Sequence, residues 1–531
     1  MTHETRSATP KASRKVSILG ATLSLLIPAA IGGCGDSSSK PTTPPITVTV
    51  GAMLPTTGPN ANSDWISAVE LALSDINDAV KAAKMTQPVA FTVEEKDTAS
   101  DETKAHDAML AYSGDSAKIV ITEASNAAIG ANKWNYEQID LVAAGMPALG
   151  APMPVISFTA TSASLNNATA TDAVPVRQEA LRDAANWFYR TCPVSNNLST
   201  IRLNEIFGGL APGSNGDVNN DGKVKVVWIG SADTATQSSI TGDIKAVNTY
   251  LGTAAGMAAI GTKTFVSESV KFDPGTDPTS FDYTMAIGQA TDNFNEQTMM
   301  PDVVPDLIIN KALPNIAIPF IKAYKQNPAG TYSIFQDGSF RRNTLLVALG
   351  TAADGQVGVS NIAFMANDSG NLFASEQSAK TGYAPAAYEA QGYDAMALAL
   401  LAVIKASIDN KTAITNATTN MADPALLTPD MVHTALDQLN TPNATVTFGT
   451  GAAEFKKAIA ALELGQSVNY NGASGNVDFD TADTTPAVTT LGDTYDYATL
   501  WKIEGGVFKE KQWFNCLPGQ NCASLAQLPA Q

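Results

Sequence analysis

Short apolar strands and amphipathic helices alternate over residues 46–158. Residues 46–50 read Ile-Thr-Val-Thr-Val, and alternating β-branched residues of this kind predict a strand. From Trp65 onward, apolar residues recur at helical spacing, so a helix is expected after the first strand. The same patterns predict a helix at 104–112 and further strands at 88–93, 118–122 and 155–158. Strands and helices in alternation indicate a parallel sheet with helices on both faces.

The alternation stops over residues 166–220 and then restarts as a second set of similar size. The interrupting stretch is polar, with one helical patch at 177–189. The second set comprises strands at 223–229, 264–267, 306–309 and 332–335 and helices at 240–251 and 316–324. Two such sets predict two α/β lobes. Ligands bind beyond the carboxyl ends of parallel strands, so the loops after the strands of both lobes should face one cleft.

The first 33 residues have the three-part layout of a secretory signal. Four basic residues within the first fifteen positions precede a charge-free run at 16–31, and two glycines then precede Cys34. The run is too short and too rich in glycine and alanine to indicate a membrane span. The residues before Cys34 resemble the lipobox of bacterial lipoproteins, in which the cysteine sulfur takes a diacylglyceryl group. An ordinary signal peptide with an incidental cysteine is the alternative.

The lipobox resemblance implies an exported protein, anchored by lipid on Cys34 to a bacterial membrane and facing the periplasm or the cell exterior. Residues 34–45 are rich in Ser, Thr and Pro, which predicts an extended tether without a core. The net charge of the 531-residue chain is −18, and the sequence has no cluster of Lys or Arg. We therefore expect no nucleic-acid partner, and no attraction to anionic lipid beyond the anchor itself.

Three cysteines follow Cys34, in a compartment that the export signal marks as oxidising. Cys516 and Cys522 enclose Leu-Pro-Gly-Gln-Asn, and Pro-Gly favours a turn that brings the two cysteines together. A local disulfide is the favoured interpretation, with Cys192 as a single, small buried side chain. Pairing of Cys192 with either C-terminal cysteine stays open, because spacing alone does not fix connectivity.

Several short motifs follow one another along residues 46–510. They are Leu-Pro-Thr-Thr-Gly-Pro at 54–59, Pro-Val-Ile-Ser-Phe-Thr-Ala-Thr at 154–161, Tyr-Arg-Thr at 189–191, Tyr-Asp-Ala-Met at 393–396, Gly-Ala-Ser-Gly-Asn-Val-Asp-Phe-Asp at 472–480 and two closing strands at 497–508. In this order they resemble the type I periplasmic binding proteins. The closest branch is that of the leucine/isoleucine/valine-binding lipoproteins, which are solute-binding proteins of ABC transporters.

The resemblance implies an α/β fold of two Rossmann-like lobes, each a parallel sheet flanked by helices, joined by a three-crossover hinge. Lobe one is expected from residues 46–200 with 356–475, and lobe two from 201–355 with 476–531. Such proteins close around a ligand between the lobes. The implied function is capture of a small polar molecule, an amino acid or an amide-like compound, for an ABC permease in the inner membrane. A ligand-sensing subunit of a signalling receptor and a surface lipoprotein with a degenerate pocket are the alternatives.

The family holds the ligand carboxylate on loops that follow the strands of lobe one. Here those loops supply Ser125 and Asn126 after the third strand, Thr159 and Thr161 after the fourth, and Thr57 after the first. Backbone N–H groups at the start of a helix suit a carboxylate because they carry partial positive charge and need a partner. An alternative role for Ser125 is to cap the helix that follows it.

Lobe two of the family supplies an acidic group for the ligand ammonium. Asp337 occupies the matching strand exit, where an ion pair removed from water would be strong, and its alternative role is that of an Asp-Gly turn residue. The loop at 230–235, which contains Asp233, lacks the aromatic residue that the family often places there. Trp65, near the first loop, either covers the apolar part of a ligand or is a core aromatic residue at a helix start.

Asp217, Asn219 and Asp221 open like a calcium-binding loop, with alternating oxygen ligands before a glycine. The twelfth position is Trp228 rather than a bidentate Glu, so a polar turn before the strand is the default interpretation. Beyond the signal the sequence has two histidines and no phosphate-binding, dinucleotide-binding or nucleophile motif. We therefore expect a binding protein with no catalytic residue, no cofactor and no metal.

Overall fold

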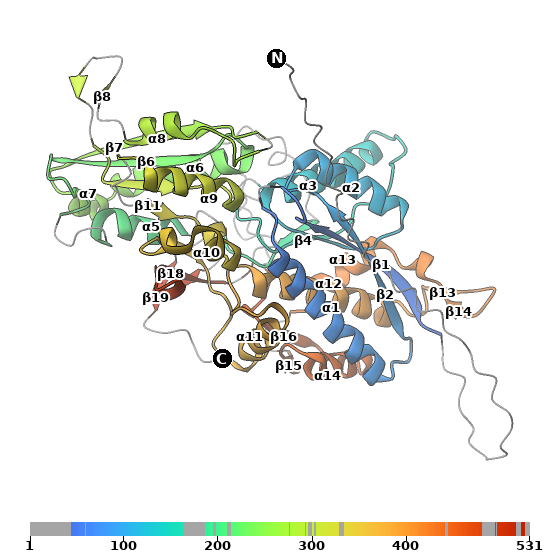
Figure 1. Ribbon diagram of the computed structural model, residues 1–531. Coiled ribbons are helices and arrows are strands. Elements are labelled where there is room, and N and C mark those ends of the chain that lie inside the picture. Colours follow the sequence, from blue (N-terminus) through green and yellow to red (C-terminus); the bar gives the residue numbers. More distant parts are fainter. Residues whose placement is uncertain are drawn as a thin grey trace, which may run out of the picture. The chain divides into compact units, whose positions relative to one another are not determined.

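The computed structural model in Figure 1 describes most of the chain from Pro44 onward. The described residues are 44–58, 60–162, 165, 186–194, 198–209, 214–275, 277–291, 294–295, 300–301, 304–328, 334–440, 444–479, 494, 496–516 and 522–525. The predicted signal, Cys34, the tether up to residue 43 and the helical patch at 177–185 lie outside these ranges.

The first sheet has five strands in the order β2-β1-β3-β4-β5, and all neighbouring strands are parallel. The strands are β1 (Ile46–Leu54), β2 (Val89–Asp97), β3 (Val120–Thr122), β4 (Val155–Ser157) and β5 (Phe188–Arg190). The predicted helix at 177–189 is wrong for its last four residues, because 186 and 187 lie outside any helix and 188 and 189 belong to β5. Pairing with β4 supplies the backbone partners of this short edge strand, and such tertiary pairing overrides local preference.

Side chains of the first sheet point alternately into two cores. Val48 and Val50 of β1 belong to one core, and Met53 belongs to the other. The first core also contains residues of α1 (Ser63–Ala83), α12 (Glu389–Asp409), α13 (Pro429–Asp437) and α14 (Ala452–Glu463), and the second those of α2 (Glu102–Gly114) and α3 (Ser125–Ala143). Figure 1 shows the two groups of helices on opposite faces of the sheet. We call this sheet with its helices lobe one.

Helix α12 is the central core element of lobe one. It is long and apolar enough to cross a membrane, but 89% of its most apolar window is buried inside the protein, as in the core helix of a globular domain. Its Asp394 carboxylate accepts hydrogen bonds from the Tyr470 hydroxyl at 2.7 Å, from the Ala473 N–H at 2.8 Å and from Ser474. The Tyr-Asp-Ala motif and the Gly-Ala-Ser-Gly hairpin therefore hold each other inside lobe one.

The second sheet has eight strands in the order β20-β19-β18-β12-β11-β10-β6-β7. Its strands are β6 (Lys223–Ser231), β7 (Thr264–Phe272), β10 (Leu307–Asn310), β11 (Ile334–Gln336), β12 (Val357–Asn361), β18 (Asp496–Glu504), β19 (Val507–Cys516) and β20 (Ala523–Leu525). The strands from β7 to β12 pair in parallel, and β18 to β20 extend the sheet in antiparallel fashion.

The second sheet also lies between two cores. Val227 and Ile229 of β6 belong to one core, whereas Val226 and Trp228 belong to the other. The first of these cores includes residues of α8 (Thr284–Thr291), α9 (Pro314–Gln326) and α10 (Asn343–Leu349), and the second includes residues of α5 (Ser199–Asn204) and α6 (Thr234–Leu251). We call this sheet with its helices lobe two.

Smaller elements complete the two lobes. They are the three-stranded sheet of β15 (Val446–Phe448), β16 (Val468–Gly472) and β17 (Gly475–Asn476), the two-stranded ribbons of β8 (Phe294–Asn295) with β9 (Met300–Pro301) and of β13 (Thr415–Asn416) with β14 (Met421–Ala422), the helices α7 (Ala254–Ile260) and α11 (Asp368–Thr381), and the short turns η3 (Glu205–Gly209), η4 (Gly338–Phe340), η5 (Gly350–Ala353) and η6 (Pro424–Leu426).

The chain passes between the two lobes three times. It leaves lobe one after β5, returns to the helices of lobe one after β12 and crosses again between β17 and β18. Strand β12 pairs with β11 and β18, so it belongs to the second sheet although the predicted boundary at residue 356 assigns it to lobe one. We retain the predicted division as a proposal, with the second crossover placed after Asn361.

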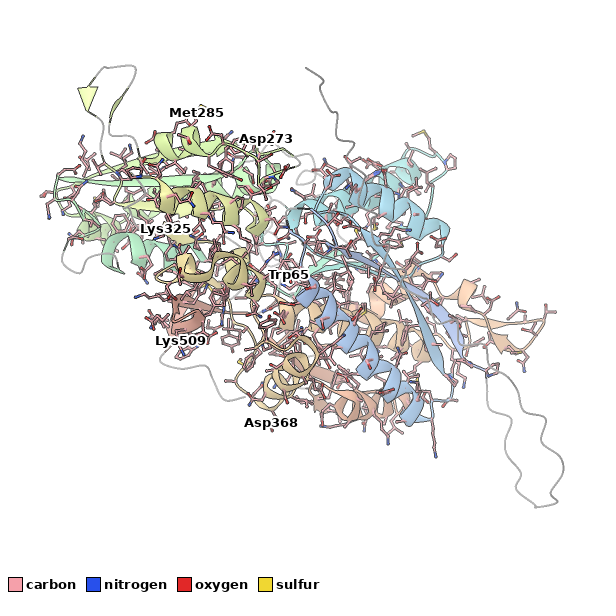
Figure 2. All side chains as sticks on the ribbon, viewed as in Figure 1. Trp65, Asp273, Met285, Lys325, Asp368 and Lys509 are labelled. Carbon is pink, nitrogen blue, oxygen red and sulfur yellow. A yellow bond between two sulfur atoms is a disulfide. The ribbon has the colours of Figure 1, made fainter. Side chains whose placement is uncertain are left out.

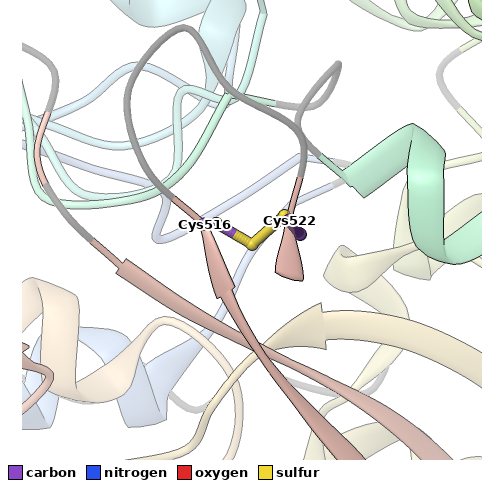
Figure 3. The surroundings of a disulfide bond; sticks show 2 residues. All are labelled: Cys516 and Cys522. Carbon is purple, nitrogen blue, oxygen red and sulfur yellow. A yellow bond between two sulfur atoms is a disulfide. The ribbon is translucent and has the colours of Figure 1, made fainter. Parts of the chain in front are cut away.

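A disulfide joins Cys516 at the end of β19 to Cys522 just before β20 (Figure 3). This local pairing is the one that the sequence favours. Cys192 is a buried thiol outside this disulfide, and it packs in the core that β1, α1 and α12 share.

Candidate functional site

A small pocket lies where the strand-exit loops of the two lobes meet. Its volume is about 80 Å³. Lobe one contributes loops that follow β1, β3 and β4, and lobe two contributes loops that follow β6, β10 and β11. The lining residues are Asn60, Trp65, Ala124, Ser125, Asn126, Thr159, Thr161, Asp233, Thr236, Ser239, Lys311, Leu313, Asp337, Ser339 and Tyr388. We call this cavity the interlobe pocket.

Seven of the eight residues predicted to contact a ligand line the interlobe pocket: Trp65, Ser125, Asn126, Thr159, Thr161, Asp233 and Asp337. Thr57 lies outside it. Thr57 lines a larger groove of about 780 Å³, which adjoins the pocket and shares Asn126, Asp233 and Leu313 with it. The Thr57 hydroxyl donates a hydrogen bond to the Asp97 carboxylate at 2.5 Å, so this side chain is engaged within lobe one.

The lobe-one wall of the pocket presents the start of α3. The capping position of α3 is Ala124, and no side chain caps the helix there. Ser125 instead accepts a hydrogen bond from the Ser162 N–H at 3.1 Å, so its role as a helix cap is wrong. The first N–H groups of a helix have no partner within the helix and carry partial positive charge. This wall therefore suits an anionic or carbonyl oxygen.

Two polar atoms of the lobe-one wall lack protein partners. The Thr159 hydroxyl and the Asn126 side-chain oxygen are buried, and neither has a hydrogen-bond partner among the residues that the structure describes. Both residues line the pocket, and Thr159 is 8% exposed. A buried polar group without a partner costs about 1–3 kcal/mol, so these atoms are available to a ligand or to water.

The lobe-two wall is charged, and its first charge is Asp233. Asp233 caps α6 by accepting a hydrogen bond from the Thr236 N–H at 2.9 Å, and it also accepts one from the Ser231 hydroxyl at 2.6 Å. The Asn126 amide of lobe one approaches the same carboxylate at 3.4 Å. Asp233 thus lies at the junction of the two walls.

Asp337 belongs to a buried cluster of two cations and two carboxylates. Its carboxylate contacts Lys311 at 2.6 Å and Arg202 at 3.2 Å, and the carboxylate of Asp243 contacts the same two cations at 3.0 and 2.8 Å. Burial raises the pKa of Asp337, but the charges of Lys311 and Arg202 outweigh it and hold the pKa well below its usual range. Asp337 also caps the turn η4 through the N–H of Gly338.

This cluster changes the role of Asp337 from the one the sequence suggests. An ammonium group at Asp337 would compete with two protein cations that already neutralise the carboxylate. Lys311, Arg202 and Asp243 are the residues that sequence reasoning missed. Lys311 and Arg202 are separated from Asp337 by 26 and 135 positions, and no local pattern marks such a cluster until the strands are assembled.

Aromatic side chains cover one end of the pocket. Figure 2 labels Trp65 at the start of α1. Its ring packs edge-on against Phe158 at 5.8 Å and against Tyr388 at 5.9 Å, and its N–H donates to the Ala387 carbonyl at 3.0 Å. Trp65 is a buried core residue that also lines the pocket, and its role in covering a ligand stays a prediction. Tyr388 supplies the second ring, and it adopts a left-handed backbone conformation (φ 70°) of the kind that concentrates at binding sites.

Direct hydrogen bonds join the lobes around the pocket. Arg342 of lobe two is buried with its guanidinium 4.0 Å from the Trp65 ring centroid, and it donates to the backbone carbonyls of Asn60 and Ala61 at 3.2 and 3.4 Å. Burial lowers the pKa of Arg342 to about 9. Asn315 of α9 donates to the Gly58 carbonyl at 2.7 Å. These contacts bind the lobes to each other in a closed arrangement.

Glu123 supports the pocket from behind. Its fully buried carboxylate accepts hydrogen bonds from Thr98 at 2.9 Å, Ser100 at 3.1 Å and Asn60 at 3.3 Å, and burial raises its pKa. Glu123 immediately precedes Ala124 and the start of α3, so these bonds fix the loop that presents Ser125 and Asn126.

The calcium-like sequence forms a closed polar turn. Asp217 is buried, and its carboxylate accepts the N–H groups of Asp221 and Gly222 at 3.1 Å and contacts Lys263 at 3.0 Å. Asn219 accepts the Asp221 N–H at 3.0 Å. Within the described part of the chain, no group of three or more His, Cys, Asp or Glu side chains is arranged to hold a metal ion.

Solved structures, but no family model and no curated protein, are similar to this chain. A scan against models of protein families finds no match, and neither does a search of curated proteins. Among solved structures, a leucine-binding protein from Thermotoga maritima is similar at 15% identity and a TM-score of 0.53, over 88% of this chain and 98% of that chain.

Two further solved structures are similar over comparable shares of this chain and of their own. A solute-binding protein of an ABC transporter from R. palustris, in complex with benzoate, has 14% identity and a TM-score of 0.54 over 91% of this chain and 98% of that chain. A branched-chain amino acid ABC transporter protein from Thermus thermophilus with bound valine has 14% identity and a TM-score of 0.53 over 91% and 97%. The two lobes, the three crossovers and this similarity together show that the chain has the type I periplasmic binding protein fold.

Proposed function

We propose that this protein binds a small polar solute in the interlobe pocket and presents it to the permease of an ABC importer. The observation that carries the proposal is the pocket itself. It forms at the strand exits of both lobes, where ligands of open parallel sheets bind, and it contains buried polar atoms without protein partners among the described residues. The proposed chemistry is binding, because the lining consists of hydrogen-bonding, charged and aromatic groups that suit recognition of a solute.

The lining favours an amino acid or an amide-like ligand. A carboxylate or carbonyl oxygen would accept N–H groups at the start of α3 and the Thr159 hydroxyl. An ammonium or amide N–H would bind Asp233, which has fewer competing cations around it than Asp337. The rings of Trp65 and Tyr388 would cover the apolar part. The pocket volume of about 80 Å³ favours a small ligand.

Proteins of similar fold support the ligand class without deciding it. The Thermus thermophilus structure contains valine, and the R. palustris structure contains benzoate. Both ligands have a carboxylate beside an apolar group, which is the combination that the α3 start and the two rings would accept. The charged lobe-two wall is where we expect the two kinds of ligand to be distinguished.

A screen of thermal stability tests the proposed function directly. The purified protein would be heated with amino acids, small amides, carboxylates and sugars, each in large excess. A ligand at ~100 times its Kd stabilises by about 2.7 kcal/mol, which raises Tm by a few degrees in a protein of this size. We expect a response to a small amino acid or amide. A response to sugars alone, or to no compound, would contradict the proposal.

We also propose that the protein is exported and anchored by lipid on Cys34. The support is the charge-free signal that ends at this cysteine. Replacement of Cys34 by serine removes the sulfur that the lipid requires. Cys34→Ser should move the protein from the membrane fraction to the soluble fraction, as followed by fractionation and palmitate labelling. Equal retention of Cys34→Ser in the membrane fraction would rule out the anchor while leaving the binding proposal intact.

A further inference from the structure

A second large cavity lies beside the second crossover. Its volume is about 850 Å³, and none of its lining residues lines the interlobe pocket. The lining comes from α10 and the turn before it, from residues 363–366 that follow β12, from residues 383–385 that precede α12, and from the β18–β19 hairpin. We call this cavity the hinge-side groove, because residues 363–366 and 383–385 both belong to the crossover segment between β12 and α12.

The walls of the hinge-side groove are mainly aromatic and aliphatic. Four rings contribute to it, those of Phe364, Tyr383, Phe508 and Trp513. Three of its apolar or aromatic side chains are unusually exposed: Val347 at 70%, Tyr383 at 51% and Val507 at 46%. Large apolar surfaces gathered in a concavity of this size are characteristic of small-molecule sites.

The floor of the groove has one polar pair. Arg341 is buried and contacts the Glu510 carboxylate at 2.7 Å, while the guanidinium lies 5.9 Å from the Phe508 ring. The Trp513 N–H donates to the same carboxylate at 2.8 Å. The Arg341 Nε–H is buried and has no hydrogen-bond partner among the described residues. Arg341 lines the groove, and a guanidinium donor without a partner favours an oxygen acceptor.

We propose that the hinge-side groove is a second binding site, which takes an uncharged aromatic molecule carrying an amide. The rings of the groove would pack against the aromatic part of the ligand. The amide oxygen would accept the free Arg341 N–H, and the amide N–H would donate to Glu510, whose oxygens each have a further lone pair.

The Arg341–Glu510 pair explains why the ligand is uncharged. A carboxylate placed at Arg341 would also meet the negative charge of Glu510, and an ammonium placed at Glu510 would meet the positive charge of Arg341. An amide offers an acceptor and a donor side by side without a net charge, so it satisfies both groups of the pair at once. The groove thus differs in chemistry from the interlobe pocket, where a carboxylate or carbonyl oxygen is expected at the start of α3.

Binding of N-phenylbenzamide to the purified protein tests the inference. Saturation-transfer NMR and calorimetry would compare it with benzoate and benzylammonium, which have an aromatic ring with one charge of either sign. We expect N-phenylbenzamide to bind at least about tenfold more tightly than either charged compound. Equal or tighter binding of benzoate or benzylammonium, or no binding of N-phenylbenzamide, would overturn the inference.

Two variants test whether N-phenylbenzamide binds in the hinge-side groove. Val347→Asp and Val507→Asp each introduce a carboxylate on an exposed wall position, so folding should be retained while the affinity for N-phenylbenzamide falls at least about tenfold. Met285→Asp is the matched control, because Met285 is 72% exposed on α8 and does not line the groove. Unchanged binding in both groove variants, or an equal loss in Met285→Asp, would overturn the inference. None of these results depends on the solute of the interlobe pocket.

Discussion

Three buried carboxyl groups of lobe one and the Asp337 cluster of lobe two are stabilised in opposite ways. In lobe one, Glu123, Glu389 and Asp394 accept hydrogen bonds from neutral donors, and burial raises the pKa of each. In lobe two, Asp337 is bound by Lys311 and a second cation, whose charges hold its pKa well below the usual range. Lobe one therefore tolerates protonation of its buried acids, whereas lobe two depends on four charges being present together.

The two walls of the interlobe pocket also differ in charge. The lobe-one wall offers helix N–H groups, hydroxyls and an amide, and none of its lining residues is charged. The lobe-two wall contributes Asp233, Lys311 and Asp337. We infer that lobe one recognises the shared polar group of a ligand class, and that the compensated charges of lobe two select among the members of that class.

Removal of one charge from the lobe-two cluster should have the largest effect. In Asp243→Ala, Arg202 and Lys311 would lose one of the two carboxylates that the described residues place beside them, inside the protein. Loss of one partner from a buried ion pair costs about 3–5 kcal/mol, because an uncompensated charge stays buried. Urea unfolding at pH 7, followed by tryptophan fluorescence, would measure the change.

The control for this variant is Asp78→Ala. Asp78 pairs with Lys81 at 3.0 Å, but both side chains are mostly exposed. An exposed pair of this kind contributes roughly 0–1 kcal/mol. If Asp243→Ala and Asp78→Ala lower the free energy of unfolding by similar amounts, the stability of lobe two does not depend on all four charges of the buried cluster.

A buried carboxyl group of lobe one should make the protein less stable as the pH rises. Burial raises the pKa of Glu389 to about 8, whereas an unfolded glutamate titrates near 4.3. The folded state therefore binds the extra proton, so the stabilisation is complete below about pH 4.3 and is lost as the pH rises towards 8. Between these limits, the free energy of unfolding should fall by up to about 1.4 kcal/mol for each pH unit.

The variant Glu389→Gln tests whether ionisation of Glu389 lowers the stability as the pH rises. Glutamine cannot ionise, so the variant should lose less free energy of unfolding than the wild type between pH 5 and pH 8. Gln377 and Ala386 donate to separate oxygens of Glu389, at 2.8 and 2.9 Å, and glutamine keeps only one acceptor oxygen. The variant should therefore be less stable at every pH, and the test compares only how the free energy of unfolding changes with pH. Urea titrations at several pH values would measure both proteins. Parallel curves for the two proteins would show that Glu389 is ionised in the folded state.

Thr159→Val separates binding from folding. The Thr159 hydroxyl has no partner among the described residues, and valine has nearly the same shape. The free protein should therefore unfold at the same temperature or slightly higher, while affinity for the solute found by the thermal screen falls about tenfold. Calorimetry would measure the affinity. A lower Tm with unchanged affinity would mean that the hydroxyl serves the protein rather than the ligand.

Loss of the Tyr393 hydroxyl in lobe one should have a smaller effect than loss of Asp243. This hydroxyl donates to Asp75 at 2.6 Å and accepts the Gly451 N–H at 3.0 Å. Tyr393→Phe removes both hydrogen bonds, so it should lower the free energy of unfolding by roughly 1–3 kcal/mol. A loss as large as that in Asp243→Ala would erase the contrast between the two lobes.

Much of the fold follows from local patterns along the chain. Alternating β-branched residues place β1 and β6 close to their observed bounds, and helical spacing places α1 and α9. The prediction is wrong for Phe188 and Tyr189, because β5 exists only through pairing with β4. Short edge strands of this kind have too few residues to show a period of their own.

The candidate site is predictable to the extent that strand exits are predictable. Loops that follow parallel strands converge on one edge of the sheet, so the strand pattern alone places the loop residues Ser125, Thr159 and Asp233 near a ligand. Tyr388 escapes this reasoning, because it precedes a helix after a crossover rather than following a strand.

The sequence by itself determined the βα alternation, the exit loops that form the interlobe pocket and the local cysteine pairing, because each depends on residues close together in the chain. Only the tertiary structure decided which charges meet. The Arg202–Asp337 contact joins residues 135 positions apart, and the Arg341–Glu510 contact joins residues 169 positions apart. Partners at such separations carry no local signature, and burial then sets whether a carboxylate is compensated by cations or holds its proton.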